Sequence, residues 1–504
     1  MRFCAVSLAK PAVVKEDARA FFEPLQVGVA CPLGVDAAVH SSRAWAQRHA
    51  DNMSKCMVKL DLENAFNAIS RDQLLQRCRE VFPGLAKWAH WCYRGDSNLQ
   101  LAHHTLDSST GVQQGDPLGP LLFALAIHDL AKELSQLTVN SRKLDLCFFY
   151  LDDGVLAGDA DVVAQALQRV KALGHSLGLK LKVDKCELIL TSDSPPDNLA
   201  DLFPQELLVD AETGESRVLL NGNFELLGAA VGDAPFCTEY GTTKVTKASA
   251  LLDSIASIED PQVALRLMRN CAGACKLTHS MRATPPQNQT VALQAFDAKV
   301  KTTFSEVTGL HPDKHQWNQA CRGLAHGGLG LRSVQLHGEA AFLASAAASA
   351  PLCHSLDSGF ALRGGSSTSE FGVALAAFNA KLPASSQVSA PEVAGAKQKE
   401  LSTKLDEAGH DSRLASLCAK DRASLLSECQ DGARDFWSVV PSNALGLAVP
   451  APEFLAELKF RLGMTNGPES FCPLCDAVLD SRGYHCRECS AGGDRTVRHP
   501  QQAA

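Results

Sequence analysis

The stretch Phe149-Tyr150-Leu151-Asp152-Asp153-Gly154 decides the fold, because it sets two adjacent carboxylates between two apolar runs. The flanking runs, 146–151 and 155–156, are rich in strand-favouring residues. They predict a β-hairpin over 146–158 with Asp152 and Asp153 at its turn. Carboxylates held beside buried strands are costly unless a cation neutralises them. An Asp-Asp turn is also ordinary surface chemistry, so the functional interpretation depends on the rest of the chain.

A second acidic position lies upstream, where Asp61 follows the apolar run 56–60. This run predicts a strand over 56–62 that carries Asp61 at its end. One strand-end aspartate and a hairpin-borne pair are what a site with two Mg²⁺ ions about 4 Å apart needs for nucleotidyl transfer. A Mg²⁺-dependent phosphohydrolase using Asp61 and Asp152 is the alternative. A Gln-Gly loop and a long multi-domain remainder argue against it, since a hydrolase needs neither.

The composition is that of a globular protein, since 45% of the 504 residues are hydrophobic and 21% are charged. The net charge of −8 argues against a strongly basic nucleic-acid binder. No run of 18 apolar residues is present, which predicts no membrane span. Lys10 interrupts the short apolar start, so we expect no signal peptide. The 18 cysteines are therefore expected as reduced thiols and metal ligands in an intracellular protein.

Strand-like and helix-like segments alternate over 56–230, which predicts one α+β sheet domain. We expect helices over 117–137 and 161–177 and a strand-like segment over 179–190. Residues 241–305 and 400–465 have mainly helical periodicity, whereas 350–400 are rich in Ser, Ala, Gly and Pro.

A Cys/His cluster near the end of the chain predicts a structural Zn²⁺ site. Its spacing is Cys472-x2-Cys475-x9-His485-x3-Cys489, in which each pair of ligands can converge on one ion. The neighbouring Cys486 could compete with Cys489 as the fourth ligand. The alternative is a set of free thiols in a flexible tail.

Four signals occur in an order that resembles palm motifs A, B, C and D of the reverse transcriptases. They are Asp61 with Ala65-Phe66, the loop Gln113–Pro120, the Asp152-Asp153 hairpin, and Lys185 within Gly178–Cys186. The segments Gln26–Gly34, Phe224–Gly228 and Gly327–Leu331 and the Cys/His cluster are similar to those of non-LTR retrotransposon polymerases. The resemblance covers nearly the whole chain. It is strongest to elements that carry a C-terminal restriction-like endonuclease.

The resemblance implies a right-hand polymerase fold of the α+β class. We expect partial fingers over 1–55, a palm with a small antiparallel sheet over 56–232 and a helical thumb over 233–345. A linker or mobile insertion over 346–400 and a helical connection over 401–465 would follow. Residues 466–504 would form the zinc element and a truncated endonuclease junction. The implied partners are an RNA template, a DNA primer or target and dNTPs, in the nucleus; the oligomeric state stays open.

The resemblance also implies roles for residues of the palm. Asp61 and Asp152 would be the main ligands of two Mg²⁺ ions, and Asp153 would support the metal site or the primer end. The main-chain carbonyl of Leu62 would be an extra ligand. Phe66 stands at the position of the steric gate that excludes the ribose 2′-hydroxyl, with a core aromatic as the alternative.

Further roles follow from the same resemblance. Gln114 and Gly115 would line the pocket beneath the templating pair, where a larger side chain would obstruct close approach. Tyr150 would pack by the primer end. Lys185 would be a general acid for pyrophosphate, or else a solvated lysine near a strand end. A basic stretch would grip the template–primer as part of the thumb, or else be a solvated helix face; it comprises Arg266, Arg269, Lys276 and Arg282.

Two departures from the resembled family bear on activity. No basic fingers segment, which would grip the incoming triphosphate, precedes Gln26, and no endonuclease follows Gly492–His499. The sequence therefore predicts a chain truncated at both ends. Two hypotheses follow: an RNA-directed DNA polymerase, or a non-catalytic nucleic-acid-binding remnant that lacks a complete fingers domain.

Overall fold

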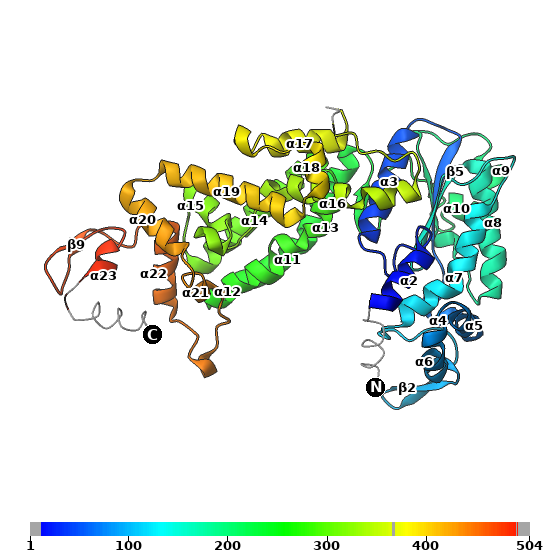
Figure 1. The fold of residues 1–504 in the computed structure, drawn as a ribbon, viewed down its shortest axis with the longest axis horizontal. Coiled ribbons are helices and arrows are strands. Elements are labelled where there is room, and N and C mark those ends of the chain that lie inside the picture. Colours follow the sequence, from blue (N-terminus) through cyan, green and yellow to red (C-terminus); the bar gives the residue numbers. More distant parts are fainter. Residues whose placement is uncertain (1–11, 365–367, 490, 492–504) are drawn as a thin grey trace. The chain divides into compact units, whose positions relative to one another are not determined.

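A computed structural model describes residues 12–364, 368–489 and 491, which form two compact units (Figure 1). The sheet unit comprises the described residues of Met1–Cys237 and Ser345–Ser366. The helical unit comprises those of Thr238–Ala344 and Ser367–Ala504. In the described part of the chain, none of the helices combines the length and the apolar character needed to cross a membrane.

The sheet unit mixes strands and helices along the chain, which confirms the α+β prediction. Its elements are α2 (Ala12–Phe22), α3 (Gly34–Arg48), β1 (Lys55–Leu60), α4 (Ala65–Ala68), α5 (Arg71–Val81), α6 (Pro83–Tyr93), β2 (Ser97–Leu101), β3 (His104–Ser108), α7 (Gly119–Gln136), β4 (Leu146–Tyr150), β5 (Asp153–Asp159), α8 (Ala160–Ser176), the 3₁₀ turn η1 (Val183–Lys185), β6 (Glu187–Leu190), α9 (Leu199–Leu202), α10 (Gln205–Leu208), β7 (Phe224–Leu226) and β8 (Ala229–Val231).

The main sheet has four antiparallel strands in the order β4-β5-β1-β6. The predicted hairpin is confirmed, since β4 and β5 pair from Leu146 to the turn, where Tyr150 lies opposite Asp153. The predicted strand over 56–62 is confirmed as β1, whose last residue, Leu60, lies opposite Gly154. This register brings the end of β1 beside the hairpin turn.

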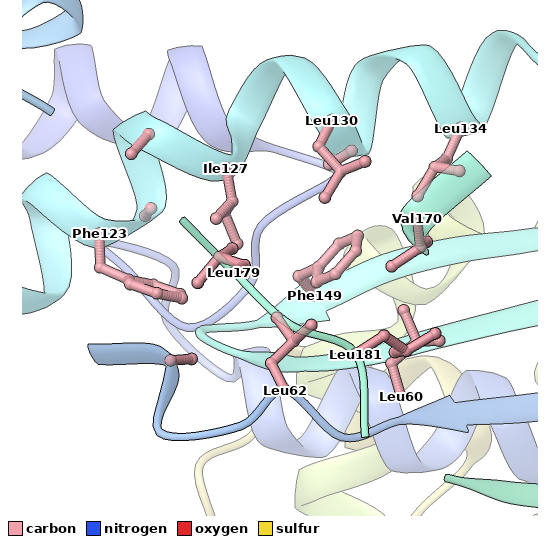
Figure 2. Close-up of a cluster of buried hydrophobic side chains, with 14 of the residues drawn as sticks. Leu60, Leu62, Phe123, Ile127, Leu130, Leu134, Phe149, Val170, Leu179 and Leu181 are labelled. Atoms are coloured by element: carbon pink, nitrogen blue, oxygen red, sulfur yellow. The ribbon is translucent and has the colours of Figure 1, made fainter. Parts of the chain in front are cut away.

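One face of the sheet is covered by α7 and α8 (Figure 1). Figure 2 shows labelled side chains of α7 that point toward the sheet, where Phe149, Leu60 and Leu62 meet them. They recur every three to four residues, as an apolar stripe on a helix does: Phe123, Ile127, Leu130 and Leu134. All of these residues belong to one buried cluster.

The opposite face of the sheet is buried as well. Side chains of the other parity, such as Met57, Phe148 and Val155, are inaccessible to solvent, and α3 packs against β4. Burial on both faces explains why the hairpin strands are continuous apolar runs rather than alternating ones.

The strand-like segment over 179–190 is only partly a strand. Leu181 forms an isolated bridge with Leu62, η1 follows, and regular pairing with β1 begins at Glu187. The charged run Lys182-Val183-Asp184-Lys185 explains the difference, because a 3₁₀ turn lets its charged side chains reach water beside the buried strands.

The helical unit confirms the helical periodicity expected over 241–305 and 400–465. Its elements are α11 (Ala234–Ala256), α12 (Pro261–Leu267), the π-helical turn η2 (Met268–Ala272), η3 (Ala274–Lys276), α13 (Thr278–Ala283), η4 (Pro286–Asn288), α14 (Thr290–Thr308), α15 (Lys314–Cys321), η5 (Leu324–His326), α16 (Val334–Leu356), α17 (Glu370–Asn379), η6 (Ala384–Ser386), α18 (Ala390–Gly395), α19 (Gln398–Ser416), α20 (Ala419–Glu428), α21 (Asp435–Ser438), η7 (Asn443–Leu445), α22 (Ala451–Leu462), β9 (Ser470–Phe471), β10 (Val478–Leu479) and α23 (Tyr484–Glu488). Helices α11 and α16 have residues in both units.

The segment 346–400 differs from the linker or mobile insertion that its composition suggested. Its described residues include the end of α16 and the whole of α17 and α18. Phe371, Phe378 and Val393 are buried there, so the segment has its own apolar anchors.

Candidate active site

Three aspartates meet at one end of the sheet. Asp152 lies in the two-residue turn between β4 and β5, Asp153 begins β5, and Asp61 follows the last residue of β1. Asp61 and Asp152 are half-buried, and Asp153 reaches solvent. Residues 91 positions apart in the chain are thus joined by the register of β1 with β5.

The three aspartates, brought together by the strand register, act on one another electrostatically. Removal from water raises the pKa of Asp152, and the charge of Asp61 raises it further. The pKa of Asp153 is raised because the turn partly shields it from water and because Asp152 and Asp61 add like charge, while Lys59 acts in the opposite direction. Clustered carboxylates with raised pKa values are typical of sites that bind a cation.

The hairpin turn is held from outside by Gln26, whose side chain is 1% exposed. Its Oε1 accepts the N–H of Leu151 at 2.8 Å and that of Gly28 at 3.0 Å, and its Nε2 donates to the Leu151 carbonyl at 3.1 Å. Leu151 has φ of 59°, a left-handed conformation that a leucine rarely adopts. A Cβ on Gly28 would lie 2.8 Å from the Leu151 nitrogen. The loop that begins at Gln26 therefore supports the turn that carries Asp152.

The segment after Asp61 is fixed by a bridge to the residues before η1. The Asp61 carbonyl accepts the N–H of Lys182 at 2.9 Å, and the N–H of Glu63 donates to the Lys180 carbonyl at 2.9 Å. These two bonds leave the carbonyl of Leu62 outside the bridge, while the Leu62 side chain is buried among Leu60, Leu179 and Leu181 (Figure 2).

Lys185 is exposed at the end of η1. Glu63 pairs with Lys180 at 2.8 Å, and this hydrogen bond lowers the pKa of Glu63, to which the charge of Lys185 also contributes. The structure thus brings Lys185 to the segment that follows Asp61. The same segment is anchored by Cys186, whose Sγ accepts the N–H of Asp61 at 3.3 Å.

Phe66 lies on α4, just after the Asp61 segment, and its ring stacks on Phe123 of α7 with centroids 4.5 Å apart and planes within 9°. The ring is half-buried, so it has both a core contact and an accessible part. The two interpretations of Phe66, as a gate and as a core aromatic, are therefore compatible. Tyr150 is also half-buried and lies opposite Asp153 at the turn.

Gln114 and Gly115 are exposed in the loop between β3 and α7. A Cβ on Gly115 would meet no atom of the chain within 4 Å, so the expected close approach of a templating pair to this glycine stays a prediction. Its φ of 82° by itself favours glycine at this position. The open space above the loop is free for a ligand.

Sequence reasoning missed the residues that hold this loop. The buried Asp116 accepts the hydroxyl of Tyr93 at 2.5 Å and the N–H of Leu118 at 3.0 Å. Burial, followed by the bond to Asp116, raises the pKa of Tyr93. Arg71 lies over the Tyr93 ring at 5.6 Å and donates to the Gly111 carbonyl at 2.9 Å. No local pattern in the sequence pairs Tyr93 with Asp116, which lies 23 positions further along the chain.

The four basic residues expected in the thumb lie in the helical unit, where three are engaged within the protein. Arg266 donates to the carbonyls of Ser438 and Val439, and Arg269 donates to that of Trp437 at 2.5 Å. Burial lowers the pKa of Arg269. Arg282 donates to the Gln398 side chain at 2.8 Å. Lys276 is exposed at the end of η3. These bonds give the arginines a structural role, and their contact with nucleic acid stays a prediction.

The Cys/His cluster forms a candidate metal site at the β9–β10 hairpin and α23. One atom from each of Cys472, Cys475, His485 and Cys489 lies within 4.8 Å of the others. The Sγ atoms of Cys475 and Cys489 are 3.7 Å apart, and those of Cys472 and Cys489 are 3.9 Å apart. A tetrahedral zinc with bonds of about 2.3 Å separates its sulfurs by about 3.8 Å. Cys486 is outside the group.

Comparison with known proteins places this geometry in context. Residues 15–228 match the family described as reverse transcriptase (RNA-dependent DNA polymerase). The chain is 24% identical over 139 residues to the Pol polyprotein of the type-1 retrotransposable element R2 of Nasonia vitripennis, which covers 26% of the chain. It is 30% identical over 169 residues to the 132 kDa protein of the retrotransposable element SLACS of Trypanosoma brucei gambiense, which covers 31% of the chain. Each match spans 14% of the relative's length.

Solved structures with some similarity include two telomerases in complex with a fragment of telomeric RNA. The enzyme of Candida albicans is 13% identical over 75% of this chain and 52% of its own, with a TM-score of 0.36. That of Candida tropicalis is 10% identical over 68% of this chain and 55% of its own, with a TM-score of 0.35.

Proposed function

We propose that the protein is an RNA-directed DNA polymerase, because residues 15–228 match the reverse transcriptase family and parts of the chain are similar to two retrotransposon proteins. It would extend a DNA primer on an RNA template with dNTPs. The observation that carries the proposal is the meeting of Asp61, Asp152 and Asp153 at one end of the sheet. The raised pKa values of Asp152 and Asp153 support it.

The donor set fits Mg²⁺. Asp61 and Asp152 would hold two ions, with Asp153 beside them, and carboxylate oxygens are the ligands that this hard cation prefers. The Leu62 carbonyl, which lies outside the neighbouring backbone bridge, would be a further ligand. When bound, such a pair of ions lowers the pKa of the primer 3′-hydroxyl and neutralises charge on the triphosphate.

The surrounding side chains would orient the substrates. Phe66, fixed against Phe123, would stand against the sugar of the incoming nucleotide and exclude a 2′-hydroxyl. The exposed Gln114 and Gly115 would line the templating base. Tyr150 would pack against the primer end, and Lys185 would protonate the leaving pyrophosphate.

The two units would have different tasks. The sheet unit would supply the palm, and the helices of the helical unit would supply a thumb for the template–primer. The Cys472, Cys475, His485 and Cys489 cluster would hold a structural Zn²⁺, as a closed Cys₃His set does. We further propose that the protein acts in the nucleus.

Primer extension on an RNA template with dNTPs and Mg²⁺ tests the proposal. We expect extension by the wild type and none by the Asp152→Ala variant. Asp197 provides a matched control, because it is an exposed carboxylate remote in sequence from the three aspartates, and Asp197→Ala should extend normally. A folded wild-type protein that binds the template–primer without extending it would favour the alternative, a non-catalytic nucleic-acid-binding remnant.

A further inference from the structure

The outer side of α6 carries a basic and aromatic face that the proposed active site does not use. A hollow of about 510 Å³ lies there, and its lining combines cations with an exposed indole. We name this surface the α6 face; it is formed by Arg79, Ala86, Lys87, His90, Trp91 and Arg94. The five residues from 86 to 94 recur with helical spacing, so they form one stripe, and Arg79 joins them from α5.

The cations of the α6 face are available to a ligand. Arg79, Lys87 and Arg94 are exposed, and no hydrogen bond or ion pair ties their side chains, or that of His90, to any described residue. The nearby acid Glu80 is already bonded to Arg77 at 2.5 Å and to Gln76 at 3.0 Å. The protein as a whole has a net charge of −8, so the α6 face is a local concentration of positive charge that would attract an anionic ligand.

Trp91 gives the α6 face a second kind of recognition. It is 54% exposed, although exposure of a large aromatic ring to water is unfavourable. Trp88 lies beneath it with ring centroids 5.0 Å apart, and Trp88 itself packs against the main core. Trp91 is thus a supported ring with an open side, flanked by cations. Stacking platforms of this kind bind the bases of single-stranded nucleic acid while the cations track its phosphates.

The inner side of the same helix connects the α6 face to the proposed site. Tyr93 faces inward and holds Asp116, which fixes the loop of Gln114 and Gly115. The two sides of a helix are separated by about 10 Å. Under the proposed function, an unpaired strand that leads to this loop would be the part of the RNA template that has not yet been copied.

We propose that the α6 face binds the unpaired RNA strand of the template, with a base on Trp91 and phosphates on Arg79, Lys87 and Arg94. This proposal rests on the proposed function for the identity of the strand. The mode of recognition, a base stacked on an aromatic ring and phosphates paired with cationic side chains, is inferred from the residues of the α6 face alone.

The test is the affinity of the full chain for a fluorescein-labelled, unstructured 12-nucleotide RNA, measured by fluorescence anisotropy. We expect Trp91→Ala to weaken binding roughly 5- to 150-fold and Trp91→Phe to restore most of it. In the Lys87→Ala/Arg94→Ala variant, the slope of log affinity against log salt should fall by about 1.4. A matched control removes the exposed Lys143 and Lys171 of the same unit, and Lys143→Ala/Lys171→Ala should keep the wild-type slope.

Several outcomes would overturn the proposal. These are wild-type affinity in both α6-face variants, losses equal to those of the control, and losses confined to a DNA of the same sequence. A change in the oligomeric state of Trp91→Ala with unchanged RNA affinity would also overturn it, in favour of a protein interface. Because RNA binding is measured without primer or dNTPs, failure of the α6 face and failure of polymerase activity are separate results.

Discussion

Replacement of Gln26 by alanine should impair catalysis more than it impairs folding. Gln26 contacts no substrate group in the proposed mechanism. Its amide instead makes three hydrogen bonds, two of them to Leu151, the residue before Asp152. Loss of these bonds should let the left-handed Leu151 relax, since that conformation costs about 1–2 kcal/mol. Asp152 would then leave its position beside Asp61.

The magnitude follows from the groups left without partners. Gln26→Ala strands the N–H and carbonyl of Leu151 and the N–H of Gly28, and each unsatisfied buried group costs about 1–3 kcal/mol. Entry of water and relaxation of the turn would reduce the total, so we expect about 3 kcal/mol. If this free-energy cost raises the activation barrier by displacing Asp152 from the reacting centre, kcat for nucleotide addition should fall roughly 100-fold.

The assay compares single-turnover primer extension and thermal unfolding for Gln26→Ala and a matched variant. Gln289 is a suitable match, because it is also 1% exposed and its side chain also makes three hydrogen bonds, in the helical unit. Gln289→Ala should lower the unfolding temperature similarly but leave kcat near the wild-type value. The reasoning would be refuted if Gln26→Ala lowered the unfolding temperature as much as Gln289→Ala and kept the wild-type kcat.

Four further predictions concern single side chains. Asp152→Asn should abolish extension yet raise the unfolding temperature at pH 7.5. The raised pKa of Asp152 means that the folded state binds its proton more tightly than the unfolded state, so the charged carboxylate lowers stability above that pKa. The stability gained by Asp152→Asn should therefore vanish as the pH falls toward 4. Phe66→Ala should reduce the preference for dNTPs over rNTPs roughly tenfold or more, measured as the ratio of kcat/KM values; an unchanged ratio would leave only the core role. Tyr93→Phe should cost about 1–3 kcal/mol in denaturant unfolding, because a buried carboxylate loses a donor; unchanged stability would contradict the anchoring role. Cys475→Ser should remove zinc detected by elemental analysis, whereas Cys486→Ser should retain one zinc per chain; zinc loss in both variants would contradict the ligand assignment.

The core of the fold was predictable from the sequence, because strong local patterns agreed with one another. The apolar runs around Asp152 and before Asp61 predicted β4, β5 and β1, and their lengths matched strands of five to seven residues. The helix expected over 117–137 was recognisable from its apolar periodicity, and the structure places it at Gly119–Gln136. The order of the motifs implied that Asp61 and the hairpin meet, and the register of β1 with β5 supplies the contact.

The supports of the site were not predictable, because they depend on contacts between distant residues with no local pattern. Nothing near Tyr93 in the sequence indicates Asp116 as its partner, and nothing near Gln26 indicates Leu151. Burial of a side chain within the fold is equally hard to predict from local sequence, and it can remove a residue from the expected binding surface. Arg269 looked available to a phosphate, yet its guanidinium is engaged by a carbonyl of the same unit.

Net charge alone is therefore a poor guide to the polyanion-binding capacity of this chain. Carboxylates cluster where the proposed function needs metal ions, and arginines such as Arg266 donate hydrogen bonds to backbone carbonyls of the helical unit. Cations that keep their side chains free, such as Lys87 and Arg94, stand together beside an exposed tryptophan. A field that attracts nucleic acid depends on such local concentrations, since the Debye length of about 8 Å at physiological salt screens the remaining acidic surface. The total of −8 is thus compatible with a polymerase that holds its template at a few dedicated places.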